Sequence, residues 1–244
     1  MKTHMGRCVV VVLALAVLVT AVVPLTGCST TFQARSVKPS GFLGDPSDYA
    51  QLRKGTGDEA LMVYFKPDVD WKAYNAILMD PVRVYYSVET GWWTSASQET
   101  VQALVNYLDA TVRKQLGDSY KFVDQPGPGV LHLRVAITDT QGSNRVLDTA
   151  SSVIPIGVAA NLLKRAVFGE NASVGEAGIE GEILDSQSGE RLAAAVDKRV
   201  GRKYTFKFNK FNAWRVAEDS YDVWALRLRN RLAELRESAP ATDR

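Results

Sequence analysis

The sequence predicts an α+β fold with layers of the α/β type: a single mixed, mostly antiparallel sheet with helices packed on it, preceded by a signal peptide and a flexible tether. Three observations predict this fold class. Apolar and polar residues alternate over 130–138, and turn residues over 185–189 join a second pair of strand-like segments. Apolar residues recur at helical spacing over 95–117 and again over 214–235. Strands that alternate with helices in this order favour a sheet covered by helices.

The N-terminal residues have the layout of a secretory signal. Lys2 and Arg7 precede an apolar run over 9–23, which is shorter than a helix needs to cross a bilayer, so a transmembrane anchor is disfavoured. The next box, Leu25–Thr26–Gly27–Cys28, resembles the bacterial lipobox. The resemblance implies that the chain is cut before Cys28, that its thiol receives diacylglycerol and that its new amino group receives a fatty acid such as palmitate.

Cleavage before Cys28 changes the chemistry of the remaining chain. The whole chain has 29 basic and 27 acidic side chains, and residues 1–27 remove two bases and no acid, so the mature chain is formally neutral. This balance disfavours a nucleic-acid binder. Cys8 is removed as well, which leaves no thiol for a disulfide, a metal or a nucleophile. Ser29, in place of the Asp that retains such lipoproteins in the inner membrane, implies the outer membrane, with the domain in the periplasm.

We expect four parts in the chain: a signal peptide over 1–27, the lipidated cysteine and a flexible tether over 28–57, a single domain over 58–237, and a disordered tail over 238–244. The tether is rich in Ser, Pro, Gly and charge. Its exception is the stretch over 40–52, whose apolar side chains suit docking onto the domain.

The first half of the domain contains two extended stretches and a helix. Leu61–Phe65 is apolar and extended. Ala76–Tyr86 is rich in strand-forming residues, and Pro81 within it predicts an edge strand or a bend, because proline cannot donate to a ladder. A capping box at Ser95 then opens a helix that stops at Gly117.

The second half contains strands and a closing helix. Tyr120–Val123 is a short strand, and Val130–Thr138 alternates, with His132 and Arg134 on the face opposite its apolar residues. The stretches Ala172–Leu184 and Arg191–Arg199 form a hairpin. The glutamates of its first strand share one side, which we expect to be solvated: Glu176, Glu180 and Glu182. An amphipathic helix over 214–235 follows.

Several stretches resemble a family of bacterial lipoproteins catalogued as domain of unknown function 3313. They are SGFLGDPSDYAQL (40–52), ILMDPVRVY (77–85), DQPGPGVLHLRVAITDT (124–140), GEAGIEGEILDSQSGERLAAAVDKRVG (175–201) and DVWALRLRNRL (222–232). The resemblance spans nearly the whole mature chain. It implies a bacterial envelope lipoprotein and no particular activity. The element order is also similar to small α/β domains of periplasmic assembly lipoproteins, a likeness of fold alone.

The sequence contains none of the common catalytic motifs: no GxSxG, HExxH, CxxC, P-loop or Rossmann glycine triplet. His132, the only mature histidine, lies in mid-strand, a position typical of a sheet-surface residue. Carboxylate pairs are the remaining option, because a glycosidase needs two. The candidates are Asp68 with Asp70, before a tryptophan, and Glu180 with Glu182, although alternating glutamates are typical of a solvated face.

Three stretches are candidates for binding. The adjacent Trp92 and Trp93 offer a flat ring to a partner, unless both pack over the sheet. The apolar stretch over 152–169 is either a buried crossover helix or an exposed patch for a partner or a membrane. Its candidate residues are Ile154, Ile156, Leu162 and Phe168. The basic stretch over 198–210 suits an anionic polymer, or is an edge strand protected by lysines. Its candidate residues are Lys198, Arg199, Arg202, Lys203 and Lys207.

These observations predict a non-enzymatic, lipid-anchored periplasmic module that binds an envelope protein, lipopolysaccharide or cell wall, with no cofactor, metal or nucleic acid. The alternative is a carboxylate-dependent enzyme that acts on envelope glycan. A deep pocket with two convergent carboxylates would favour the enzyme, and a closed body with exposed aromatic side chains would favour the binding module.

Overall fold

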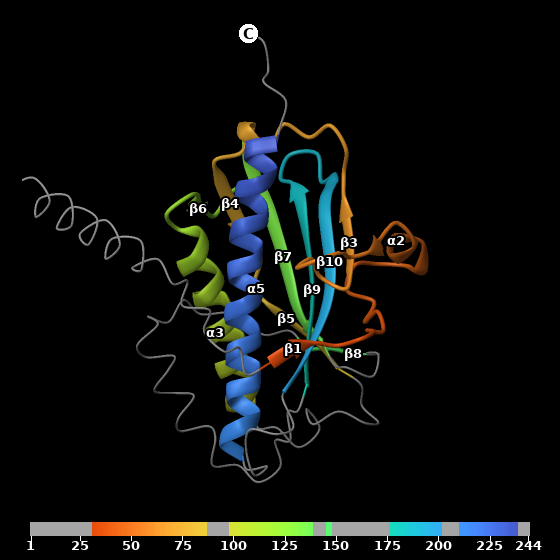
Figure 1. Ribbon diagram of the computed structural model, residues 1–244. Helices are drawn as coiled ribbons and strands as arrows, with labels where there is room; N and C mark the ends of the chain where they lie inside the picture. Colours follow the sequence, from red (N-terminus) through yellow and green to blue (C-terminus); the bar gives the residue numbers. More distant parts are fainter. Residues whose placement is uncertain (1–30, 87–97, 139–144, 148–175, 202–209, 239–244) are drawn as a thin grey trace, which may run out of the picture.

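The computed structural model describes residues 31–86, 98–138, 145–147, 176–201 and 210–238 (Figure 1). Ten strands of the described chain form one sheet. Helices α3 (Gln98–Leu116) and α5 (Lys210–Ser238) pack side by side on one face of it. Six strand pairs are antiparallel and three are parallel. The predicted fold class, a mixed and mostly antiparallel sheet with helices packed on it, is confirmed.

The order of strands in the sheet places the three longest strands at its centre. Across the sheet lie β2 (Arg53–Lys54), β3 (Met62–Phe65), β10 (Arg191–Gly201), β9 (Glu176–Asp185), β7 (Val130–Thr138), β4 (Ala76–Met79) and β6 (Lys121–Val123). In addition, β1 (Thr31–Gln33) pairs with β10, and β5 (Arg83–Tyr86) pairs with β7 and β8 (Arg145–Leu147). The predicted hairpin is thus the central antiparallel pair of β9 and β10.

The main core lies between the sheet and the two long helices. The apolar side chains of β7, from Leu131 to Ile137, face α3 and α5 and are buried, as their alternation predicts. Apolar residues at three-four spacing on both helices meet them, including Leu104 and Leu108 on α3 and Tyr221 and Leu232 on α5. One apolar layer between the sheet and the helices therefore positions β7, α3 and α5 relative to one another.

Pro81 divides the predicted strand over 76–86 into two. Strands β4 and β5 lie before and after it, and both pair parallel with β7, the first with Val130–Leu133 and the second with Ala136–Thr138. The predicted bend is confirmed. The predicted edge position is wrong for β4, which has β6 and β7 as neighbours. Because β4 ends before Pro81 and β5 begins after it, the sheet needs no backbone hydrogen bond from the proline.

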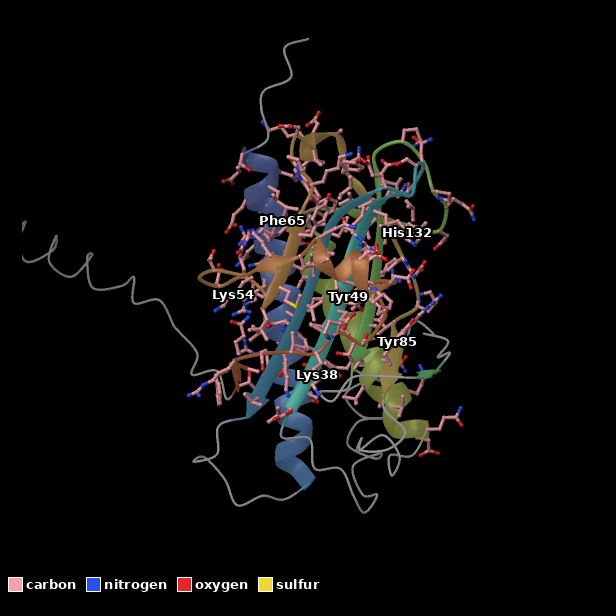
Figure 2. The ribbon with its side chains drawn as sticks, turned by 90° about the vertical axis from the view of Figure 1, so that its right-hand side faces the viewer. Lys38, Tyr49, Lys54, Phe65, Tyr85 and His132 are labelled. Atoms are coloured by element: carbon pink, nitrogen blue, oxygen red, sulfur yellow. The ribbon has the colours of Figure 1, made fainter. Side chains whose placement is uncertain are left out.

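The structure places residues 31–57 in the domain rather than in a tether. This N-terminal segment carries β1, the short helix α2 (Pro46–Ala50) and β2. It lies across the sheet face opposite α5, as Figure 2 shows for Tyr49. Phe42, Leu43, Tyr49 and Leu52 are buried against that face, so the predicted docking of the stretch 40–52 is confirmed. The apolar area that these side chains remove from water is what holds the segment in place.

Candidate functional site beneath the C-terminal helix

A fully buried carboxylate lies beneath the N-terminal segment. Glu180 of β9 is 0% exposed. Its carboxylate accepts hydrogen bonds from the backbone N–H of Ser40 at 2.5 Å and from the hydroxyl of Tyr49 at 2.6 Å. Burial raises the pKa of Glu180, while these two donors oppose the shift. Burial, together with the neighbouring Glu180, also raises the pKa of Tyr49.

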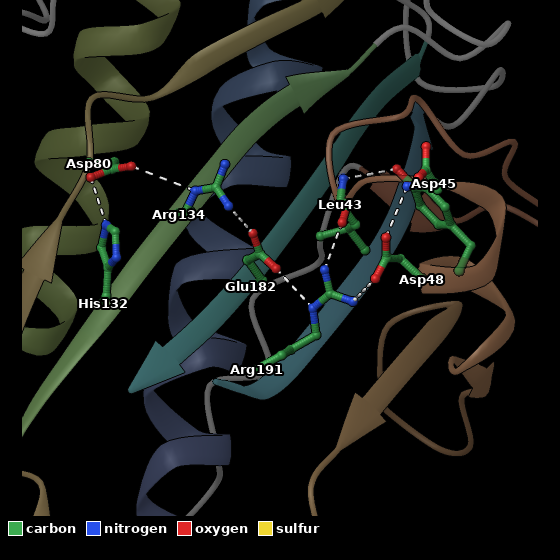
Figure 3. A network of polar contacts seen from close by, with 9 residues as sticks. Leu43, Asp45, Asp48, Asp80, His132, Arg134, Glu182 and Arg191 are labelled. Atoms are coloured by element: carbon green, nitrogen blue, oxygen red, sulfur yellow. Dashed lines mark hydrogen bonds and ion pairs between the residues drawn. The ribbon is translucent and has the colours of Figure 1, made fainter. Parts of the chain in front are cut away.

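A chain of ion pairs extends from this point across the same face (Figure 3). Glu182 receives hydrogen bonds from both Arg134 and Arg191. Arg191 reaches on to the N-terminal segment, where it donates to Asp48 Oδ1 at 3.1 Å and to the carbonyl oxygen of Leu43 at 2.6 Å. The network therefore joins β7, β9 and β10 to the segment that covers them.

His132 closes the other end of this network. Its Nε2 lies 2.7 Å from Asp80 Oδ1, and Asp80 Oδ2 lies 3.6 Å from Arg134. The His132 side chain is partly exposed. This is the sheet-surface position that the sequence predicts, with a contact to the Asp80 carboxylate in addition.

The prediction that Glu180 and Glu182 lie on a solvated face is wrong. Both are buried, because the N-terminal segment covers the side of β9 that the alternation pattern assigns to solvent. Their oxygens are held by the donors of that segment and by two arginines. Neither carboxylate is therefore open to a glycan, and the geometry gives both a role in attaching the segment.

The acidic pair before Trp71 also has a local role. Asp70 accepts a hydrogen bond from the backbone N–H of Lys72 at 3.1 Å, which caps the short helix η1 (Trp71–Ala73). The Trp71 ring is buried in the main core. It is therefore closed to a sugar ring, and Asp68 with Asp70 does not form the acid and aromatic surface that the sequence suggests.

The predicted lipidation site and most of the candidate binding residues lie outside the described residues. These are Cys28, Trp92, Trp93, Ile154, Ile156, Leu162, Phe168, Arg202, Lys203 and Lys207. Two of the basic candidates are described. Lys198 pairs with Glu176 at 2.6 Å. Arg199 is buried, and β1 and β9 pair with β10 on either side of it. Arg199 is therefore in the interior rather than on a polymer-binding edge.

A cavity of about 160 Å³ opens between α5 and the sheet. The lining is mostly apolar, and it is contributed by β3, β7, β9, β10 and α5, with two residues of α3 and the loop over 58–60. Its apolar residues include Val63, Phe65, Leu108, Val112, Val135, Ile179, Ala193, Ala195, Trp224, Leu228, Leu232 and Leu235. The space exists because Gly181, Ala193 and Ala195 put little or no side chain under the helix. It is the candidate functional site of the described chain.

One carboxylate at the mouth of this cavity is held by four donors. Asp197 accepts hydrogen bonds from Trp224 Nε1 and Gln33 Nε2 at 2.8 Å each, from the backbone N–H of Leu61 at 3.2 Å, and from Arg227 at 3.3 Å. Its side chain is almost fully buried. The acid is therefore a junction that ties β1, α5 and the residue before β3 to β10.

The second carboxylate at the mouth is ion-paired. Glu59 receives two hydrogen bonds from Arg53, at 2.7 and 2.8 Å, and Arg231 lies 3.5 Å from it. The hydrogen bond from Arg53 lowers the pKa of Glu59 to about 2. A general acid needs a raised pKa at neutral pH. The apolar cavity can therefore receive an apolar group. Glu59 at its mouth is poorly suited to act as a general acid, because its pKa is lowered.

Sequence reasoning missed the cavity, although a signal is present. Three alanines in a row, Ala193–Ala195, lie within a central strand, where alanine is depleted. Gly181 lies next to Ala195 across the pair of β9 and β10. Small residues at adjacent positions on a helix-covered face are a sign of unfilled space.

The described chain shows neither a metal-ligand cluster nor a membrane-spanning helix. Within those ranges, no group of three or more His, Cys, Asp and Glu side chains is placed to hold a metal ion. None of the helices described there has the length and apolar character needed to cross a membrane.

Comparison with known proteins gives a family. The profile of the family described as "Protein of unknown function (DUF3313)" matches residues 38–228. The chain is 25% identical over 178 residues to "Uncharacterized lipoprotein YdcL" of Escherichia coli K12, which covers 73% of this chain and 78% of that protein. The protein of the same name from Escherichia coli O157:H7 gives the same figures.

Two solved structures, both PelC dodecamers from Paraburkholderia phytofirmans, are distantly similar. Their TM-scores are 0.33 and 0.31, at 12% and 13% identity, and they cover 70% and 68% of this chain and 94% and 95% of their own. Scores this low carry no argument about assembly. The family profile, in contrast, matches well over half of the sequence. The chain therefore belongs to the DUF3313 family of proteins of unknown function.

Proposed function

We propose that this chain is a lipoprotein, held by lipid on Cys28 at the periplasmic face of the outer membrane, whose domain binds an apolar side chain of an envelope partner protein without catalysing a reaction. The lipobox and the lipoprotein name of the Escherichia coli relative support the anchor. Ser29 supports the outer membrane. Thr31 already pairs with β10, so a lipid on Cys28 would be attached close to the domain.

The cavity beneath α5 is the observation that carries the binding part of the proposal. Its volume of about 160 Å³ and its apolar lining resemble those of cavities that take up benzene or xenon in other proteins. An occupant of this size is one aromatic ring or one branched aliphatic side chain. Such a single anchoring side chain in a pocket is how many protein interfaces gain most of their affinity.

The carboxylates support the non-enzymatic part of the proposal. A glycosidase needs one carboxylic acid of raised pKa and a second carboxylate across the sugar. At the cavity mouth, Glu59 has a lowered pKa and Asp197 is held by four donors. Glu180 has a raised pKa but is enclosed beneath the N-terminal segment.

Filling the cavity tests the site directly. Ala195→Leu places a larger side chain in the cavity, whereas Ala233→Leu makes the same change at an exposed position of α5. With benzene as the probe, we expect saturable shifts of the methyl NMR signals of Val63 and Leu228 in the wild type and in Ala233→Leu. We expect these shifts to be lost in Ala195→Leu, while far-UV circular dichroism stays unchanged.

The same variants identify the partner. The lipidated wild type, captured from detergent-solubilised envelopes, should retain a reproducible protein that Ala195→Leu loses and Ala233→Leu keeps. Binding only to lipopolysaccharide or cell wall, unaffected by Ala195→Leu, would show that the cavity is not the site. Release of sugar fragments from purified cell wall would instead establish the enzyme.

A further inference from the structure

Strand β1 fixes the N-terminal end of the domain. Thr31–Gln33 pairs antiparallel with Arg199–Gly201. The guanidinium group of Arg199 also donates to the hydroxyl and to the carbonyl oxygen of Thr31, at 2.9 Å each. Both residues are buried. The sheet therefore fixes the position of Thr31 in the domain.

Only two residues separate Thr31 from Cys28. A fully extended chain spans at most about 3.6 Å per residue, so the three steps between them reach about 11 Å. The 29 residues of α5, which runs along the length of the sheet in Figure 1, measure about 44 Å at 1.5 Å per residue. A lipid on Cys28 thus brings the β1 end of the domain close to the membrane and keeps the turn between β9 and β10, at the other end of β10, away from it.

The surface at this end has the composition of a membrane-contacting surface. Phe32 is 47% exposed, and within the described chain Leu226 is the only other exposed large hydrophobic side chain. Arg35 and Lys38 follow on the same segment and are exposed. Figure 2 places Lys38 toward the end of the sheet where β9 begins. The sequence from Ser29 to Gly44 contains no acidic residue. Aromatic rings favour the membrane interface, and each cation near an anionic surface strengthens binding about fivefold.

We propose that the β1 end of the domain lies on the membrane, with Phe32 among the lipid headgroups and with Arg35 and Lys38 against the phosphates of anionic phospholipids. This inference rests on the lipid anchor of the proposed function. It assigns an orientation to the domain, in which the mouth of the α5 cavity lies to the side of the membrane-facing surface and stays open to the periplasm.

Fluorescence quenching in vesicles tests the orientation. The mature chain has no cysteine other than the lipidated Cys28, so one new cysteine can be labelled alone. The lipidated protein carrying Phe32→Cys, labelled with nitrobenzoxadiazole, is reconstituted into vesicles of phosphatidylcholine and phosphatidylglycerol with headgroup spin-labelled lipid. We expect loss of fluorescence there, and no loss for the same label at Gln187→Cys, which is exposed in the turn between β9 and β10.

A second label keeps the phenylalanine in place. Ser36 is exposed on the same segment, so a label at Ser36→Cys reports on the surface while Phe32 is intact. Adding Phe32→Ser should reduce the quenching at this position. Adding Arg35→Gln and Lys38→Gln should remove its dependence on phosphatidylglycerol.

The outcomes separate this inference from the proposed function. A mass spectrum that shows unmodified Cys28 refutes the anchor itself. A lipidated protein whose Phe32 label is quenched no more than the Gln187 label refutes only the orientation. The orientation is also refuted if the Phe32 label is shielded from both the lipid quencher and aqueous iodide, since a second copy or a partner protein would then cover it.

Discussion

Tyr49→Phe is the sharpest test of how the N-terminal segment is attached. The substitution keeps the buried ring and removes one oxygen atom. That hydroxyl donates to Glu180 at 2.6 Å and accepts from the backbone N–H groups of Gly41 and Leu43, at 2.9 and 3.1 Å. Because Glu180 is fully buried, water cannot replace the lost donor. The variant should therefore destabilise the domain without changing its packing.

The expected loss follows from those three hydrogen bonds. A hydrogen bond to a charged group contributes about 1.5–3 kcal/mol and a neutral one about 0.5–1.5 kcal/mol. The bond from Gly41 is partly exposed and the bond from Leu43 is buried. We therefore expect a total loss of about 3 kcal/mol. In urea unfolding of the mature domain, with a slope of about 2 kcal/mol per molar, the midpoint should fall by about 1.5 M.

A matched control isolates the hydroxyl. Tyr85 packs edge-on against Phe42 on the same face, with ring centroids 5.5 Å apart, and its hydroxyl makes no hydrogen bond within the described ranges. Tyr85→Phe should change the free energy of unfolding by less than about 0.5 kcal/mol. If Tyr49→Phe costs as little as Tyr85→Phe, the hydroxyl does not hold the segment to Glu180 and the reasoning fails.

The loss of unfolding free energy in Tyr49→Phe should also depend on pH. A raised pKa in the folded state means that the fold favours protonated Glu180, so the stability linked to this group is present at low pH and is lost as pH rises through the folded pKa. Removing the Tyr49 donor, which stabilises the ionised form, raises that pKa further. The difference in unfolding free energy between wild type and Tyr49→Phe should therefore be larger at about pH 8 than at about pH 5. A difference that is constant, or larger in acid, would contradict this assignment.

Two further predictions concern the sheet and the cavity mouth. In Gly178→Ala, the new Cβ would lie 2.5 Å from the hydroxyl oxygen and 2.9 Å from the carbonyl oxygen of Thr138, so we expect a loss of more than about 2 kcal/mol by thermal or urea unfolding. Gly181→Ala on the same strand is its control: the nearest atom would be 3.5 Å away, and a comparable loss there would show that strand propensity and not the clash is responsible. Trp224→Phe removes the indole donor 2.8 Å from Asp197 and should cost about 2 kcal/mol in urea unfolding followed by far-UV circular dichroism; a change below about 0.5 kcal/mol would mean that the other donors to Asp197 suffice.

Much of the fold could be predicted because its signals are local. The alternation of β7, the hairpin turn over 185–189 and the helical spacing of α3 and α5 each lie within one short stretch of sequence. Backbone geometry alone fixes which side chains share a face at these spacings. The bend at Pro81 is equally local, because it follows from the missing N–H of one residue.

The polar part of the structure could not be predicted in the same way. The alternation pattern places Glu180 and Glu182 correctly on one face of β9, yet it cannot say what covers that face. Their burial depends on a segment about 140 residues earlier, as the hydrogen bond from Ser40 to Glu180 shows. The interior position of Arg199 likewise depends on β1, which lies 168 residues away.

The sequence by itself determined the predicted address, the order of the elements and the apolar face of each one, because periodicity and a short motif carry that information within a few residues. Only the tertiary structure decided that the residues after the lipobox belong to the domain, that the glutamates of β9 hold them there, and that a cavity remains under α5. The first two depend on which segments, distant in the sequence, pack against each other. The cavity depends on whether the side chains of α5 are large enough to fill the space above small residues such as Gly181 and Ala195.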